Sequence, residues 1–114
     1  MPDVETPLCP ISAIPEGAAK GFTVHHFKLF VVRRDNRLFV YGNACPHLGV
    51  ELNWLPDQFL DRDGSLIQCS THGALFTIES GLCIAGPCVD KHLTPVAHEI
   101  RGDTVWVTLP PART

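Results

Sequence analysis

Two short stretches of the chain decide how the rest is interpreted: Cys45-Pro46-His47 and Cys69-Ser70-Thr71-His72-Gly73. Each combines one cysteine with one histidine, first with the spacing Cys-x-His and then with the spacing Cys-x-x-His. Together they offer two thiolate sulfurs and two imidazole nitrogens, all of which bind transition metals. Because the sulfur and nitrogen ligands are divided equally between two stretches, the pattern predicts a metal centre held between two loops.

The two stretches resemble the ligand loops of the Rieske ferredoxin family. Proteins of this family hold a [2Fe–2S] cluster with two Cys on one iron and two His on the other. The resemblance implies that Cys45 and Cys69 bind the buried iron and that His47 and His72 bind the outer iron. It also implies one [2Fe–2S] cluster as the cofactor and single-electron transfer as the activity.

The sequence around the expected ligands resembles that family over about residues 8–109. Small or apolar residues follow each ligand pair, and residues 81–87 resemble the family's proline-containing loop, which covers the cluster. The expected neighbours of the cluster are Leu48, Gly49, Gly73, Ala74, Phe76, Gly86 and Pro87. The resemblance implies a single Rieske domain over residues 1–114, with a cluster-binding part at about residues 45–88.

Two positions near the second ligand loop bear on the reduction potential. High-potential members of the family carry a Ser and a Tyr where this chain has Ala74 and Phe76, and a disulfide where it has Val50 and Thr71. Hydrogen bonds to the cluster sulfurs raise the potential, so loss of both hydroxyls implies the low-potential, ferredoxin-type branch. A plainer interpretation, that Ala74 and Phe76 pack a hairpin, is compatible with this one.

A structural zinc site is the main alternative for the four ligands, since zinc also accepts two Cys and two His. Zinc sites usually pair Cys with Cys and His with His, whereas each pair here mixes the two residue types. The spacing from Cys45 to His47 is also tight for two ligands of a single ion. Chance placement of unrelated cysteines and histidines is a further alternative. The mixed pairs favour the two-iron cluster over both.

The composition predicts one small domain. The chain has 114 residues, and no stretch approaches the ~18 consecutive apolar residues of a membrane helix. It begins Met1-Pro2-Asp3, without the basic and apolar segments of a signal peptide. A net charge of −3 argues against nucleic-acid binding. Five cysteines without an export signal favour metal binding in a reducing compartment, so we expect a cytoplasmic location.

Short β-branched and aromatic runs recur along the chain, separated by polar or glycine-containing turns. A first strand that contains Cys9 is expected, and further strands at residues 22–27, 29–32, 38–41, 66–68, 75–78, 96–100 and 104–109. A polar turn at residues 33–37 is expected to join two of these strands as a hairpin. Ten prolines and nine glycines argue against long helices. We therefore expect an all-β fold of packed antiparallel sheets, with a small cluster-binding subdomain formed by the two ligand loops and the Gly-Pro loop.

Residues 54–60 lengthen the segment between His47 and Cys69 and place Trp54 and Phe59 in a loop. Exposing such large apolar side chains is costly, so they form either a cap over one end of the domain or an apolar patch for a partner. The dipeptide Pro56-Asp57 resembles the start of a turn or helix and favours the cap.

Three cysteines lie outside the ligand pairs. Cys9 is expected to be a buried small apolar residue. Cys83 and Cys88 flank the Gly-Pro loop, either as a redox-sensitive pair or as small side chains packed beneath a tight loop. The packing role is preferred, because a bridge forms only if the loop folds back sharply enough to bring the Cα atoms within about 7 Å.

The resemblance implies an electron carrier between a reductase and a terminal enzyme such as an aromatic-ring oxygenase. Family members that oxidise substrates carry a separate large domain, for which 114 residues leave no room, so the chain is not expected to be an enzyme. Its expected partners are redox proteins, not nucleic acid or membranes. The alternatives are a small subunit of an assimilatory nitrite reductase, a cluster-bearing sensor and a structural zinc module.

Overall fold

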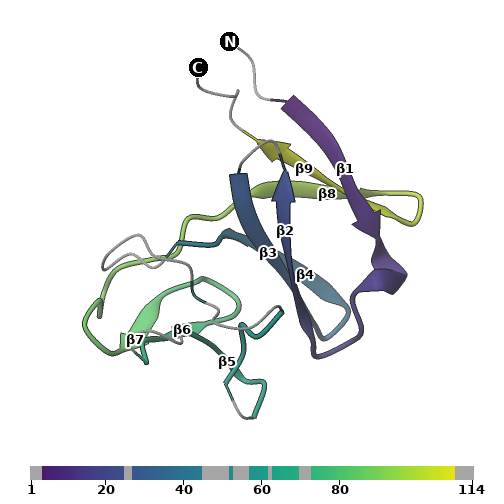
Figure 1. Ribbon diagram of the computed structural model, residues 1–114. Coiled ribbons are helices and arrows are strands. Elements are labelled where there is room, and N and C mark those ends of the chain that lie inside the picture. The colour runs from purple at the N-terminus through teal and green to yellow at the C-terminus, as the bar shows by residue number, and fades with distance from the viewer. Residues whose placement is uncertain are drawn as a thin grey trace.

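The computed structural model describes residues 4–24, 27–44, 52, 57–61, 63–69 and 73–109. Three three-stranded antiparallel sheets account for the strands in this part of the chain, in the orders β1-β9-β8, β2-β3-β4 and β5-β6-β7 (Figure 1). This arrangement confirms the predicted all-β fold of antiparallel sheets. The elements are β1 (Val4–Pro10), the 3-10 helix η1 (Ile11–Ala13), β2 (Ala19–Val24), β3 (Phe27–Arg34), β4 (Arg37–Gly42), β5 (Leu66–Gln68), β6 (Leu75–Thr77), β7 (Cys83–Ala85), β8 (Ala97–Arg101) and β9 (Thr104–Leu109).

A two-residue turn at Asp35 and Asn36 joins β3 to β4, because Arg34 still pairs with Arg37. Both turn residues have positive φ, +54° and +59°, as tight hairpin turns require. The Glu16 carboxylate accepts the backbone N–H groups of both residues, at 2.7 and 2.8 Å, and hydrogen bonding from Asn36 above all lowers the pKa of Glu16. The expected turn at residues 33–37 is therefore shorter, and both strands extend into it.

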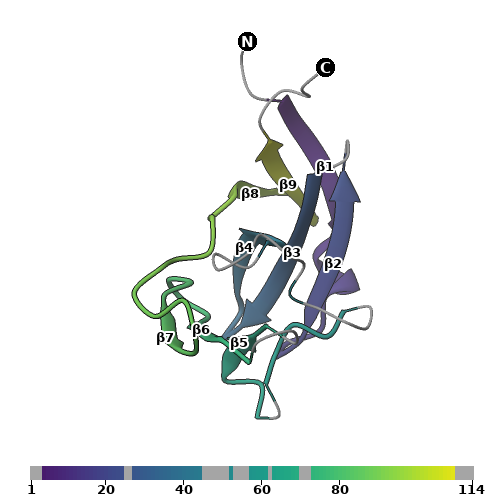
Figure 2. The same cartoon turned by 60° about the vertical axis from the view of Figure 1, so that its left-hand side comes forward.

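The central strand β3 is buried on both of its faces. Its residues 29–32 are fully buried, although a strand with one solvent face would alternate. Leu29 and Val31 pack in one hydrophobic core with residues of β9, and Phe30 packs in a second hydrophobic core with Phe76 of β6. Figure 2 shows the sheet of β2, β3 and β4 between the other two sheets. The central sheet therefore supplies both cores.

Tyr41 joins β4 to the turn between β6 and β7. Its hydroxyl donates a 2.6 Å hydrogen bond to the Ile78 carbonyl oxygen, and its ring lies against Gly81. Burial, with a smaller contribution from the Glu79 carboxylate, raises the pKa of Tyr41 to about 12. This contact fixes the small sheet of β5, β6 and β7 against the central sheet.

The described end of the insertion, residues 57–60, packs onto the central sheet. Phe59 is 1% exposed and stacks on Phe30, with ring centroids 4.5 Å apart. The Asp57 carboxylate accepts the Gly21 backbone N–H at 2.8 Å. Phe59 therefore belongs to a cap, as preferred, and not to an exposed patch, whereas Trp54 lies outside the described residues.

One short strand was not predicted. Cys83–Ala85 forms β7 and pairs with β6, although the sequence there resembles a loop between glycines. The second difference concerns Phe27, which begins β3 instead of ending the preceding strand. In the described part of the chain, no helix is long and apolar enough to cross a membrane.

Candidate metal centre

Cys69 is the one predicted ligand among the described residues, and it is fully buried directly after β5. Two backbone hydrogen bonds hold its position. The Cys69 N–H donates to the Ala74 carbonyl at 2.9 Å, and the Gly73 N–H donates to the Cys69 carbonyl at 2.8 Å. Gly73 has a φ of +71°, in the region that favours glycine. Hydrogen bonds therefore fix Cys69 and Gly73, the first and last residues of the second ligand stretch.

The pairing of the small sheet brings three loop ends together. In an antiparallel sheet the end of one strand lies beside the start of the next. Cys69 follows the end of β5, Ala74 precedes the start of β6, and Gly86 follows the end of β7. Cys69 and Ala74, on either side of the second ligand stretch, and Gly86 of the Gly-Pro loop therefore lie at the same end of this sheet.

The Gly-Pro loop lies against the backbone of Ala74, the residue that follows the second ligand stretch. Gly86 has a φ of +102°, and a Cβ atom placed on it would lie 2.7 Å from the Cα of Ala74. Only a glycine allows this approach without displacement of the chain. Gly86 and Pro87 themselves are exposed, whereas Ala74 and Phe76 are fully buried and pack the hairpin.

Asn43 connects residues on either side of the first ligand stretch, a role that the sequence alone did not indicate. Its side-chain Oδ1 accepts the backbone N–H of Leu52 at 2.8 Å, and its own N–H donates to the Lys28 carbonyl at 2.9 Å. The buried Asn43 side chain thus holds Leu52, which follows the first ligand stretch in the sequence, beside the end of β4. The available signal was a polar residue at the end of an apolar strand, two positions before the predicted ligand Cys45.

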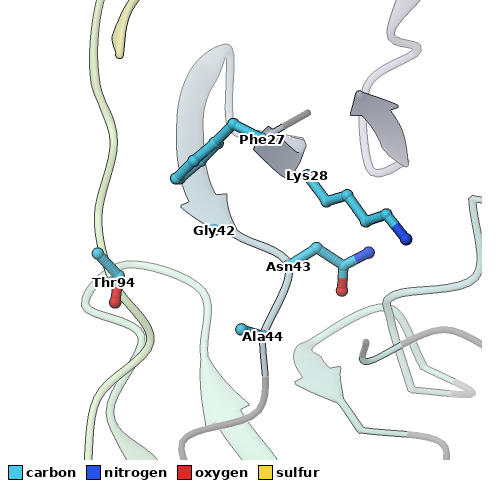
Figure 3. A pocket seen from close by; sticks show the side chains of 6 residues that line it. All are labelled: Phe27, Lys28, Gly42, Asn43, Ala44 and Thr94. Atoms are coloured by element: carbon cyan, nitrogen blue, oxygen red, sulfur yellow. The ribbon is translucent and has the colours of Figure 1, made fainter. Parts of the chain in front are cut away.

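A pocket lies beside this anchor at the end of β4 (Figure 3). Asn43 and Lys28 extend to the same side of the chain in this view, and Phe27 extends to the other (Figure 3). The lining residues are Phe27, Lys28, Gly42, Asn43, Ala44 and Thr94. The pocket therefore borders the residue that precedes Cys45.

The remaining predicted ligands, Cys45, His47 and His72, lie outside the described residues, as do Leu48 and Gly49. Within the described ranges, no three His, Cys, Asp or Glu side chains form a group that could hold a metal ion. The four-ligand set therefore remains a prediction from the sequence. What the structure adds is the placement of Cys69, Gly73, Ala74, Phe76, Gly86 and Pro87.

Comparison with known families decides between the alternatives for the metal. A sequence model of the Rieske [2Fe-2S] domain matches residues 4–105. The chain belongs to the Rieske [2Fe-2S] domain family. The cofactor of this Rieske protein is therefore one [2Fe–2S] cluster, and its activity is electron transfer.

Relatives of this Rieske protein include ferredoxin subunits of dioxygenases. The chain is 26% identical over 106 residues to the 3-phenylpropionate/cinnamic acid dioxygenase ferredoxin subunit of Escherichia coli (strain K12), covering 92% of this chain and 93% of that subunit. The same dioxygenase ferredoxin subunit of Shigella flexneri also matches with 26% identity over 106 residues, again covering 92% of this chain and 93% of the subunit.

Solved structures share the fold. The ferredoxin of carbazole 1,9a-dioxygenase from Nocardioides aromaticivorans IC177 superposes with a TM-score of 0.71 at 21% identity, covering 93% of this chain and 99% of the other. A chain from the reduced complex between oxygenase and ferredoxin in carbazole 1,9a-dioxygenase gives a TM-score of 0.79, also at 21% identity. That match covers 96% of this chain but 29% of the other, so this Rieske protein spans less than a third of that longer chain.

Cys69, the predicted ligand among the described residues, has surroundings that suit a [2Fe–2S] cluster. No hydrogen bond joins the Cys69 sulfur to another described residue, and complete burial of this sulfur suits a ligand of the inner iron. The bound cluster supplies reversible uptake and release of one electron. The chain supplies the fixed position of Cys69, the buried side chains of Ala74 and Phe76 in the same core, and the contact of Gly86 with Ala74.

Proposed function

We propose that this Rieske protein carries single electrons from a reductase to a terminal oxygenase and does not itself oxidise a substrate. The supporting observation is that the chain matches 93% of the length of a dioxygenase ferredoxin subunit, so the two proteins correspond over nearly the whole carrier. The same relative favours the oxygenase role over the nitrite reductase role. A cytoplasmic location remains a prediction from the cysteine content.

The proposed ligands are Cys45, His47, Cys69 and His72, in one domain over residues 1–114 with its cluster-binding part at about residues 45–88. Burial of Cys69 supports this ligand set, because a thiolate of the inner iron is expected away from solvent. The proposal is tested by Cys69→Ser, which should abolish the iron content and the EPR signal of the dithionite-reduced protein. Cys9→Ser is the control and should retain both. A Cys69→Ser protein with full iron content would overturn the ligand assignment.

The proposed docking surface for the oxygenase is the Gly-Pro loop. Of the three large hydrophobic side chains exposed in the described part of the chain, Ile84 and Val89 flank this loop, with exposed fractions of 49% and 50%. Gly86 and Pro87 between them are also exposed, and Gly86 lies against Ala74, the residue after the second ligand stretch. An apolar surface beside the cluster excludes water from the contact and shortens the path for the electron.

The third exposed side chain, Ile100, offers a matched control. It is also 49% exposed, but it lies on β8, in the sheet on the other side of the central sheet (Figure 1). Ile84→Lys should slow electron transfer to an oxygenase by about tenfold at limiting carrier concentration, as for a central interface residue. Ile100→Lys should leave the rate unchanged, and both variants should keep the wild-type reduction potential. Equal slowing by the two variants would place the docking surface elsewhere.

A further inference from the structure

Two buried thiols face each other beneath the Gly-Pro loop. Cys83 and Cys88 are each 1% exposed, and their sulfur atoms are 3.1 Å apart. The Cys88 thiol donates to the Cys83 sulfur, and the Cys83 thiol donates to the Ala85 carbonyl oxygen at 3.2 Å. A disulfide requires an S–S distance of about 2.0 Å, so the two sulfurs must approach each other by about 1 Å to form one.

The backbone explains why residues five apart in the sequence meet. After β7 the chain turns back along that strand, where the Cys83 N–H donates to the Lys91 carbonyl at 2.8 Å and the Asp90 N–H donates to the Cys83 carbonyl at 3.1 Å. The Lys91 N–H donates to the Cys88 carbonyl at 2.9 Å and closes the turn. This is the sharp reversal that a bridge between the two cysteines needs. The sulfurs are therefore brought together by secondary structure, independently of an S–S bond.

We propose that Cys83 and Cys88 form a reversible disulfide that locks the Gly-Pro loop over the cluster under oxidising conditions. The oxidant is a peroxide, for which hydrogen peroxide is the probe. One thiol is oxidised to a sulfenic acid as the O–O bond breaks and one water leaves. The second sulfur then displaces hydroxide from the sulfenic sulfur, forming the S–S bond and releasing a second water. Two thiols and one peroxide thus give one disulfide and two waters, and a dithiol reductant reverses the change.

The bridge would act on the cluster through the contact between Gly86 and Ala74. Gly86 lies between the two cysteines in the sequence, and its backbone presses against Ala74. The Ala74 carbonyl in turn accepts the Cys69 N–H. A bridge that limits opening of the loop therefore limits opening at a cluster ligand. This role is separate from electron transfer to an oxygenase, and its test needs no partner protein.

Peptide mapping of the holoprotein tests formation of the bridge. Cleavage after Glu79 and Glu99 releases residues 80–99, in which Cys83 and Cys88 are the only cysteines. After brief peroxide treatment and alkylation in denaturant, we expect this peptide to be unlabelled and lighter than the dithiol by two hydrogen atoms. Prior treatment with dithiothreitol should restore two labels. The proposal would be overturned if the peptide from peroxide-treated protein carried two alkyl labels without reductant, or if either cysteine were found as a sulfinic acid.

The rate at which an iron chelator removes the cluster tests whether the disulfide holds the Gly-Pro loop in place. Peroxide-treated holoprotein should lose its visible absorbance several-fold more slowly than the same sample after dithiothreitol treatment. The pair Cys83→Ala with Cys88→Ala should remove this difference, whereas Cys9→Ser, which changes a cysteine in the other core, should retain it. Equal rates for the oxidised and reduced wild-type protein would overturn the locking role even if the disulfide forms.

Discussion

Gly86 lies against Ala74 so closely that a Cβ atom on Gly86 would stand 2.7 Å from the Ala74 Cα and 3.1 Å from its Cβ. Real Cβ atoms essentially never approach backbone this closely, and Gly86 also has a φ of +102°. Ala74 is fully buried and bonded to Cys69, so it has no room to move away. This contact joins the Gly-Pro loop, through Ala74, to the proposed cluster ligand Cys69.

Gly86→Ala should therefore destabilise the loop and accelerate loss of the cluster. For a residue with a side chain, the positive φ alone lowers the free energy of unfolding by about 1–3 kcal/mol, and the clash with Ala74 lowers it further. The measurements are the urea midpoint of the holoprotein and the half-life of its visible absorbance in a chelator.

Gly102→Ala is the matched control for this prediction. Gly102 has a φ of +61°, but nothing lies within 4 Å of the position where its Cβ would be. This variant should lower stability by the backbone strain alone and leave the half-life of the cluster unchanged. Similar half-lives for the two variants would show that the contact with Ala74 does not protect the cluster.

The reduction potential should lie near the lower end of the Rieske range, which runs from about −150 to +300 mV. Ala74→Ser and Phe76→Tyr add hydroxyl groups at two buried positions beside the second ligand loop. Each should raise the potential in protein-film voltammetry if its hydroxyl donates to a cluster sulfur. Phe22→Tyr adds the same hydroxyl in the other core and should leave the potential unchanged. A wild-type potential well above zero would contradict assignment to the low-potential branch.

Asn43→Ala should weaken the first ligand stretch. The variant leaves the Leu52 N–H without its acceptor in a buried position, at a cost of about 1–3 kcal/mol. Iron content after purification and the unfolding free energy should both fall. Asn43→Asp keeps an acceptor oxygen at the same place and should retain more iron than the alanine variant. Full iron content in Asn43→Ala would show that the anchor at Leu52 is dispensable.

Tyr41 should titrate only at strongly alkaline pH. Burial raises its pKa from 10 to about 12, so between these values the folded protein keeps a proton that the unfolded chain has lost. The stabilising contribution is complete below about pH 10 and declines as the pH rises towards about 12. Tyr41 is the sole tyrosine, so the tyrosinate absorbance reports on it alone.

Tyr41→Phe completes this prediction. It leaves the buried Ile78 carbonyl without its donor and should cost about 1–2 kcal/mol at neutral pH. The variant should also lose less stability than the wild type between pH 10 and pH 12. A wild-type tyrosinate midpoint near 10 in the folded protein would contradict burial of the hydroxyl.

Local chemistry made much of the fold predictable. Short runs of β-branched and aromatic residues predicted most strands, and the polar residues around Asp35 and Asn36 predicted the hairpin of β3 and β4, since these preferences depend on neighbours in the chain. The short strand β7 was missed because Cys83–Ala85 lies between glycines and is stabilised by its partner β6. Pairing with a distant segment overrode the local preference.

For the candidate metal centre too, some features are predictable from the sequence and others only from the tertiary structure. Four ligand types and their spacing are written in the sequence, and so is the absence of hydroxyls at Ala74 and Phe76. Only the tertiary structure places Gly86 on Ala74, joins Asn43 to Leu52 and brings the Cys83 and Cys88 sulfurs within 3.1 Å. The reason is that ligand chemistry belongs to single residues and short motifs, whereas these contacts depend on how three sheets pair and pack, which is a property of the whole chain.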